Sequence, residues 1–155
     1  MRFGERARLR ALFAFATSGA SEAEFSGHPM HALVLVMVGG GVGAGLRHLV
    51  NLAAARLAGT GFPAGTMTVN IVGSFVMGLL VAWLALRFSE GGQHVRLFLA
   101  TGVLGGFTTF SSFSLDAYAL WERGAHGTAV AYVLISVVVG LAALGAGLML
   151  GRALG

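Results

Sequence analysis

Residues 102–114 read Gly-Val-Leu-Gly-Gly-Phe-Thr-Thr-Phe-Ser-Ser-Phe-Ser and decide the fold, because they place polar groups inside an apolar segment. No charged residue lies between Arg96 and Asp116, so the stretch is expected at membrane depth. Its three glycines weaken helix continuity, and five of its side chains carry hydroxyls. Irregular backbone is tolerated in a membrane only where protein or a water-filled cavity surrounds it. We therefore predict a membrane helix broken near its middle, with a functional site at the break.

The predicted break frees backbone groups and is followed by a repeated aromatic residue. Freed carbonyl oxygens can ligate a cation. Phe107, Phe110 and Phe113 recur every third residue and are expected to stack along one side of the following helix. Such a stripe usually packs or faces lipid, but the interleaved serines indicate that part of it faces something polar. The edges of aromatic rings carry partial positive charge, so two rings can hold an anion without a competing formal charge.

The composition is that of an integral membrane protein. Of 155 residues, 56% are hydrophobic and 10% are charged, and few soluble domains could keep so much apolar surface away from water. The formal charge of +4 comes from arginine alone, without a basic face that would bind nucleic acid. There is no cysteine for a disulfide framework. Because no carboxylate pair, activated nucleophile or metal-ligand spacing occurs at membrane depth, we do not expect an enzyme.

Four apolar stretches approach or exceed the roughly 20 residues that span a bilayer. They are expected at about 32–52, at about 63–86, at about 96–121, and between Arg123 and Arg152. Short connections rich in turn-forming residues separate them, and their many glycines predict close helix packing. The sequence therefore predicts an all-α integral membrane fold with four transmembrane helices in one domain, residues 30–155.

Residues 1–29 differ from the rest, being arginine-rich and then small and polar. Three interpretations compete: a targeting sequence, an amphipathic surface helix, or upstream sequence translated from too early a start codon. We favour the last, with Met30 as the working start, because these residues contribute nothing that the four-helix architecture needs.

Orientation in the membrane follows the bias of lysine and arginine in short loops. Counted from Met30, one side of the predicted bundle carries Arg87, Arg96 and Arg152, and the other carries Arg47, Arg56 and Arg123. Because this count shows no bias, the chain is expected to insert both ways up. Dual insertion permits an antiparallel homodimer around a two-fold axis in the membrane plane.

Polar side chains at membrane depth allow two interpretations. Asn70 is either interhelical glue, worth roughly 0.6 to 2 kcal/mol, or a ligand whose two uncharged N–H donors suit a small anion that must later be released. We expect Thr66, Thr68 and Ser74 to bond to carbonyls of their own helix.

Charged and hydroxyl side chains near the span ends also allow more than one interpretation. Arg47, near the end of the first predicted span, is expected to reach the interface or to cap carbonyls. Asp116 marks the mouth of the third span, as a solvated end or as a group that controls ion access. Tyr132 and Ser136 are four residues apart and face the same way, with Gly140 one turn further.

Three motifs together resemble the signatures of the Fluc (CrcB-type) fluoride channels. They are Gly41-Val-Gly-Ala-Gly-Leu-Arg47, Gly65-Thr-Met-Thr-Val-Asn70 and the stretch 102–114. The resemblance covers residues 30–152 in the family's order and spacing, and the third motif is highly specific. It implies a dual-topology antiparallel homodimer with two fluoride pathways. It also implies a sodium ion at the dimer centre, held by the backbone carbonyls of Gly105 and Thr108 from both subunits.

The same resemblance implies which side chains line the pathway. Asn70 matches the pore asparagine, and Phe110 and Phe113 match the paired pore phenylalanines. Ser112 resembles part of the polar lining, and Tyr132 and Ser136 fit a polar track on the fourth helix. Gly140 falls where the family often has a further hydroxyl, and Asp116 stands where it more usually has glutamate. Arg47 belongs to the first motif.

The expected function is passive export of cytoplasmic fluoride across a bacterial inner membrane, which protects the cell from fluoride. One alternative is a small, four-helix, dual-topology, proton-coupled drug exporter, which would need a carboxylate in the first span; none lies between Met30 and Asn51. Another is a non-transporting scaffold subunit, which would tolerate Phe110→Ile and Asn70→Ala.

Overall fold

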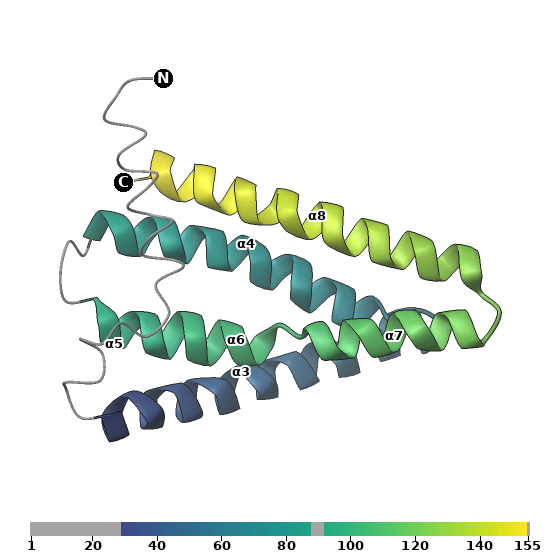
Figure 1. The fold of residues 1–155 in the computed structure, drawn as a ribbon, viewed down its shortest axis with the longest axis horizontal. Helices are drawn as coiled ribbons and strands as arrows, with labels where there is room; N and C mark the ends of the chain where they lie inside the picture. The colour runs from purple at the N-terminus through teal and green to yellow at the C-terminus, as the bar shows by residue number, and fades with distance from the viewer. Residues whose placement is uncertain (1–28, 88–91, 155) are drawn as a thin grey trace.

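The computed structural model describes residues 29–87 and 92–154, so the predicted extension 1–29 lies outside the described residues except for Pro29. The described elements are α3 (Pro29–Ala58), α4 (Ala64–Arg87), α5 (Gln93–Arg96), the π-helix η1 (Leu97–Leu104), α6 (Gly105–Phe107), α7 (Phe110–Glu122) and α8 (His126–Ala153). All of these described elements are helical (Figure 1).

Four helical segments are long and apolar enough to cross a membrane, as predicted. They are Met30–Ala58, Ala64–Arg87, Gln93–Glu122 and His126–Ala153. The first is longer than the predicted 32–52, because the helix continues past Arg47 and His48 without interruption. The third is a composite of α5, η1, α6 and α7.

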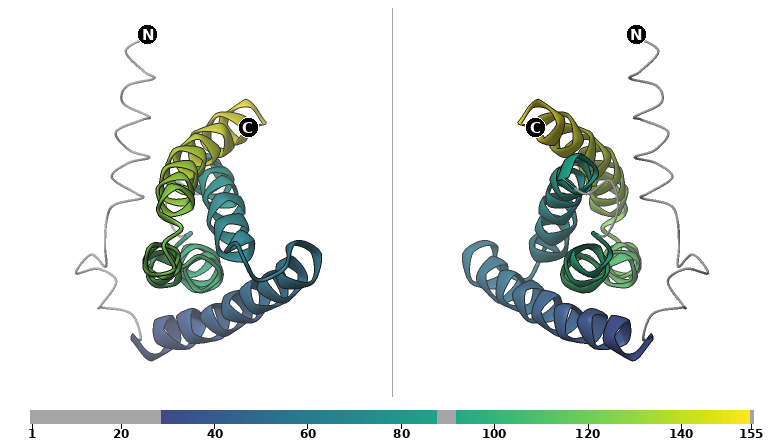
Figure 2. Two further views of the ribbon diagram at one scale, coloured as in Figure 1. Left: turned by 90° about the vertical axis from the view of Figure 1, so that its right-hand side faces the viewer. Right: turned by 90° about the vertical axis from the view of Figure 1, so that its left-hand side faces the viewer.

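The four spans pack as two pairs. α4 and α8 run in the same direction and pack along each other, while α3 packs against η1 and α6 (Figure 1). Seen along the bundle, α3 lies beneath the third span and crosses it obliquely (Figure 2). The third span is thus held between α3 on one side and the α4–α8 pair on the other.

Glycines allow both pairs to approach at backbone distance. On the α3 side, any side chain at Gly43 would collide with the Val103 carbonyl, and one at Gly106 would collide with Gly40. On the α4–α8 side, Gly78 faces the Leu144 carbonyl in the same way. Close approach gains van der Waals contact where lipid offers no hydrophobic driving force. The packing role predicted for these glycines therefore has a direct steric basis.

The third span loses its helical backbone at two residues, Thr108 and Thr109. Thr108 has φ −78° and ψ 159°, and Thr109 has φ −155° and ψ 117°, both extended. The glycines expected to weaken the helix remain helical: Gly102 lies in η1, and Gly105 and Gly106 lie in α6. Gly102 and Gly106 pack closely on α3, whereas Gly105 is exposed, and the interruption falls on the β-branched pair that follows them.

A small core at the α7–α8 end fixes the positions of two aromatic rings. Leu120, Ala129 and Tyr132 are buried, and Phe113 and Phe62 pack against them. The turn into α8 is closed by hydrogen bonds from Gly124 N to Trp121 O (2.9 Å) and from Ala125 N to Leu120 O (3.1 Å). Gly124 adopts φ 76°, the left-handed conformation that ends many helices. This turn sets α7 against α8.

Candidate functional site

Asn70 on α4 holds the extended segment through both sides of its carboxamide. Its Nδ2 donates to the Thr109 carbonyl at 3.1 Å, and the Thr109 N–H donates to its Oδ1 at 2.8 Å. A buried peptide group without partners is destabilising by about 1–3 kcal/mol. The Asn70 Oδ1 therefore replaces the helical acceptor that the Thr109 N–H has lost, and Nδ2 adds a bond to the Thr109 carbonyl.

This pairing limits what Asn70 can offer a ligand. An asparagine side chain has two N–H donors and one carbonyl acceptor. One donor and the acceptor are engaged with Thr109. One N–H, and not the two expected from the sequence, therefore remains for a bound anion.

Thr109 is the residue at the interruption that sequence reasoning did not single out. It caps α7: its Oγ1 accepts from Ser112 N at 3.2 Å and donates to Ser112 Oγ at 3.1 Å. It also lies 3.2 Å from Ser111 Oγ. The available signal was its place as a threonine directly before a helix, which is a favoured N-cap. Ser112 thus belongs to the helix cap within one subunit.

Arg47 reaches the same segment from α3. Its Nη1 donates to the Thr108 carbonyl at 3.3 Å, the capping role that the sequence left open. Because α3 extends to Ala58, Arg47 lies well inside the span instead of near its end. A guanidinium at that depth is stable only when it is paired with polar groups.

Because Arg47 lies at membrane depth, it no longer counts among the arginines at the ends of the bundle. Arg87, Arg96 and Arg152 then stand at one end of the bundle, and Arg56 and Arg123 stand at the other. The difference is a single arginine, which is still a weak bias for orientation.

A groove of about 410 Å³ lies where the interruption meets α4 and α8. It brings together four of the predicted pathway residues, Asn70, Phe110, Phe113 and Ser136. The groove also contains Ser74, which had been expected to bond to its own helix. Ser136 is 8% exposed, and its hydroxyl finds no hydrogen-bond partner among the described residues. A buried hydroxyl without a partner is a group available to a ligand.

Aromatic rings form a row that leads away from the groove. The Phe110 and Phe113 centroids are 5.6 Å apart, and those of Phe113 and Tyr132 are 5.3 Å apart. Phe62 continues the row, edge-on to Tyr132 at 5.7 Å. Phe107 lies before the interruption, beside Gly43 and Gly73, so the expected stack of three phenylalanines is wrong and only two share α7.

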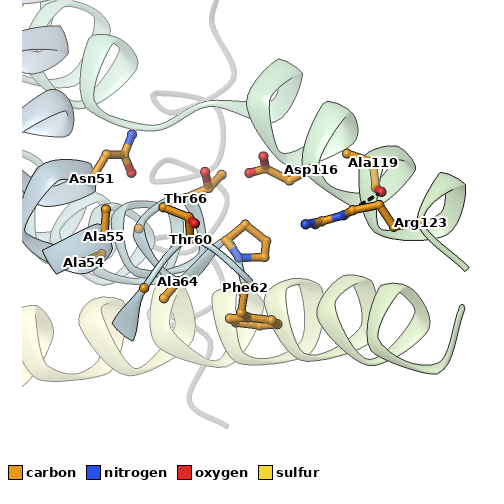
Figure 3. A pocket seen from close by; sticks show the side chains of 13 residues that line it. Asn51, Ala54, Ala55, Thr60, Phe62, Ala64, Thr66, Asp116, Ala119 and Arg123 are labelled. Carbon is orange, nitrogen blue, oxygen red and sulfur yellow. Dashed lines mark hydrogen bonds between the residues drawn. The ribbon is translucent and has the colours of Figure 1, made fainter. Parts of the chain in front are cut away.

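The row ends at a second pocket, of about 200 Å³, near the loop between α3 and α4 (Figure 3). The Tyr132 hydroxyl donates to Asp116 Oδ2 at 3.5 Å, and Asp116 lines this pocket. Arg123 points into the same space, with its Nε bound to the Ala119 carbonyl at 3.1 Å (Figure 3). Asp116 therefore stands between the aromatic row and a pocket that also holds an opposite charge.

The carbonyls of Gly105 and Thr108 are the predicted ligands of a cation. Because Thr109 N bonds to Asn70, the Gly105 carbonyl has lost its usual helical donor. The Thr108 carbonyl already accepts from Arg47, but a carbonyl oxygen has a second lone pair. Gly105 is exposed on the surface of the single subunit. Free carbonyl oxygens of this kind fit a hard cation, and one chain supplies only part of a coordination shell.

Comparison with known proteins agrees with these features. Residues 34–148 match the family described as "CrcB-like protein, Camphor Resistance (CrcB)". A protein of Mesorhizobium japonicum named fluoride-specific ion channel FluC is 58% identical over 125 residues, covering 81% of this chain and 99% of the relative. A protein of the same name from Methylobacterium nodulans is 59% identical over 124 residues, covering 79% and 97%. With four apolar spans, three signature motifs and these matches, the chain belongs to the CrcB family of membrane proteins.

Proposed function

We propose that the chain is a fluoride-selective ion channel that lets cytoplasmic fluoride leave the cell passively. Relatives that are 54–59% identical carry that name. The observation that supports the same role in this chain is the groove beside the non-helical pair Thr108–Thr109. There, one free N–H of Asn70 and the unpartnered Ser136 hydroxyl face the same space as two phenylalanine rings.

The groove has the chemistry that a small, strongly hydrated anion requires. Fluoride gives up water only where donors replace it, and the Asn70 N–H and the Ser136 O–H are such donors. The positive edges of Phe110 and Phe113 add attraction without a formal charge. Neutral donors keep binding weak enough for the ion to leave again. Tyr132 and Asp116 then lead to the pocket at the end of the bundle.

We further propose that two chains, inserted in opposite orientations, assemble into the working channel. The Phe110 side chain is 79% exposed in the single subunit, which leaves one side of the groove open. A second copy placed against this face would cover both Phe110 and Gly105. The nearly balanced arginines favour insertion in both orientations.

The same arrangement offers a place for a structural sodium ion. Two copies would bring the carbonyls of Gly105 and Thr108 together at the two-fold axis. A bound sodium ion would supply positive charge there and link the subunits. Arg47, through its bond to the Thr108 carbonyl, positions that carbonyl and adds positive field.

The inner membrane of a bacterium supplies the driving force. Its negative interior pushes an anion outward, so a passive pore is sufficient for export and no coupling carboxylate is needed. This separates the proposal from a proton-coupled drug exporter.

Efflux from liposomes tests the proposed function. Vesicles loaded with potassium fluoride receive a potassium ionophore, and a fluoride electrode records release. We expect fast fluoride efflux, slow chloride efflux from matched vesicles, and a large loss of fluoride efflux for Phe110→Ile that elutes as the same oligomer. Leak no faster than from protein-free vesicles would reject a channel and favour a non-transporting scaffold, and wild-type efflux of Phe110→Ile would show that the ion does not pass beside this ring.

A further inference from the structure

Ser74 lies next to the proposed pathway but has no assigned role. It follows Asn70 by four residues on α4, so the two side chains share one face, one turn apart. Both line the groove that also contains Ser136. α4 and α8 run in the same direction (Figure 1), so residues one turn further along both helices lie at similar depth.

The Ser74 hydroxyl stands opposite Gly140. A Cβ atom at Gly140 would lie 3.8 Å from Ser74 Oγ and would meet no other described atom within 4 Å. α8 therefore presents Tyr132 and Ser136 on successive turns and then, at Gly140, only backbone. At the turn where α8 lacks a polar side chain, α4 supplies one.

The sequence predicted that the Ser74 hydroxyl bonds to a carbonyl of its own helix, and the structure does not show this bond. Among residues 29–87 and 92–154, no hydrogen bond of this hydroxyl is found, and the side chain is half-buried. The Ser136 hydroxyl is likewise without a partner in the described part of the chain. The buried Ser136 hydroxyl and the half-buried Ser74 hydroxyl thus lie on neighbouring turns of one groove, and each can donate a hydrogen bond to a ligand there.

We propose that Ser74 is a further fluoride-binding residue. It continues, on α4, the line of polar side chains that Tyr132 and Ser136 form on α8. The ion passes from Asn70 and Ser136 to the Ser74 hydroxyl. Beyond Ser74 the groove is lined by Met77 and Leu144, so this hydroxyl is the last polar side chain of the groove in that direction. This inference rests on the proposed channel function.

Removal of the hydroxyl tests the proposal. For Ser74→Ala we expect fluoride efflux from liposomes to fall roughly tenfold, the loss typical of a hydrogen bond to a charged group. Ser74→Thr keeps the hydroxyl and should retain most of the efflux. Thr68→Ala is the matched control, because Thr68 lies on the same helix and is exposed, away from the groove. Wild-type efflux of Ser74→Ala, or equal losses in Ser74→Ala and Ser74→Thr, would overturn the proposal.

A second-site variant separates ion binding from packing. Gly140→Ser places a hydroxyl beside the position of Ser74, so Ser74→Ala/Gly140→Ser should recover much of the efflux lost in Ser74→Ala. A double variant that stays at the level of Ser74→Ala would contradict a role in binding. Absence of efflux from the wild type would instead reject the channel function itself, so the two failures are distinguishable.

Discussion

At the scale of single residues, Asn70 in the proposed channel serves the fold and the ligand with different atoms of one carboxamide. Its Oδ1 and one N–H hold the peptide group of Thr109, and only the second N–H faces the groove freely. The proposed hydrogen-bond donor to the anion therefore also holds Thr109 in its extended, non-helical conformation. Substitutions at Asn70 must be interpreted with both roles in view.

Asn70→Asp keeps one of the two hydrogen bonds to Thr109 and removes both N–H donors of the side chain. The carboxylate can still accept from the Thr109 N–H, but it loses the donor to the Thr109 carbonyl and the donor to the anion, and it adds repulsion. We expect fluoride efflux to fall at least tenfold, since a hydrogen bond to a charged group is worth about 1.5–3 kcal/mol. Liposome efflux, with size-exclusion chromatography to check assembly, measures this. Unchanged efflux would show that the Asn70 side chain only holds the backbone.

Sequence alone named several residues that the structure brings into one groove, because polar and aromatic side chains are rare at membrane depth. Asn70, Phe110, Phe113 and Ser136 are of this kind. Thr109 was not named, and Ser74 was expected only to bond to its own helix, since the importance of both depends on tertiary partners. The partner of Thr109 is 39 residues away in the chain, and Ser74 matters only because Gly140 faces it.

At the scale of elements, the third span combines tight packing before the interruption with a capped helix after it. Gly102 and Gly106 lie against the backbone of α3, which anchors the first half. The second half begins with the Thr109 cap. The interruption thus lies between two well-fixed pieces, and this keeps the groove in place.

Alanine substitutions on α3 test this anchoring. Gly43→Ala would collide with the Val103 backbone, and overpacking of this kind destabilises by about 1–3 kcal/mol. Gly45→Ala, on the same helix, meets no described atom within 4 Å and should be neutral or slightly stabilising, because alanine favours helix over glycine. Thermal unfolding in detergent should show a lower midpoint for Gly43→Ala only. Equal midpoints for the two variants would mean that α3 does not anchor the third span.

The number and order of the elements could be predicted from hydropathy, but two details could not. The first helix continues through Arg47 because the Arg47 guanidinium donates a hydrogen bond to the Thr108 carbonyl, a contact between residues that are 61 positions apart in the chain. The interruption falls after the glycines, because packing on α3 keeps their backbone helical while Asn70 stabilises the extended Thr109. Both outcomes depend on tertiary contacts that override local preference.

At the scale of the whole molecule, the distribution of charge bears on assembly. With Arg47 at depth, the two ends of the bundle differ by one arginine. A chain with so little bias is expected to insert in both orientations, and in the proposed assembly a second copy covers the open side of the groove at Phe110.

Added charge tests this assembly. His94→Lys raises the count of positive residues to four against two at its end, and Thr60→Lys/Gly61→Lys/Arg152→Gln reverses it to two against four, with every added lysine at an exposed position. Each variant alone should insert mainly in one orientation and lose fluoride resistance in cells, because antiparallel pairs become rare. Co-expression of the two should restore resistance. Full resistance from either variant alone, with a single orientation shown by cysteine labelling, would contradict the antiparallel dimer.

The most direct measurement is an experimental structure of the full chain in lipid with fluoride present. Our account predicts density for a single small ion about 3 Å from Asn70 Nδ2, between that amide and the edges of the Phe110 and Phe113 rings, with Thr108 and Thr109 extended. A continuous helix through these two threonines, or a groove filled by lipid or by a side chain of a second copy, would contradict it.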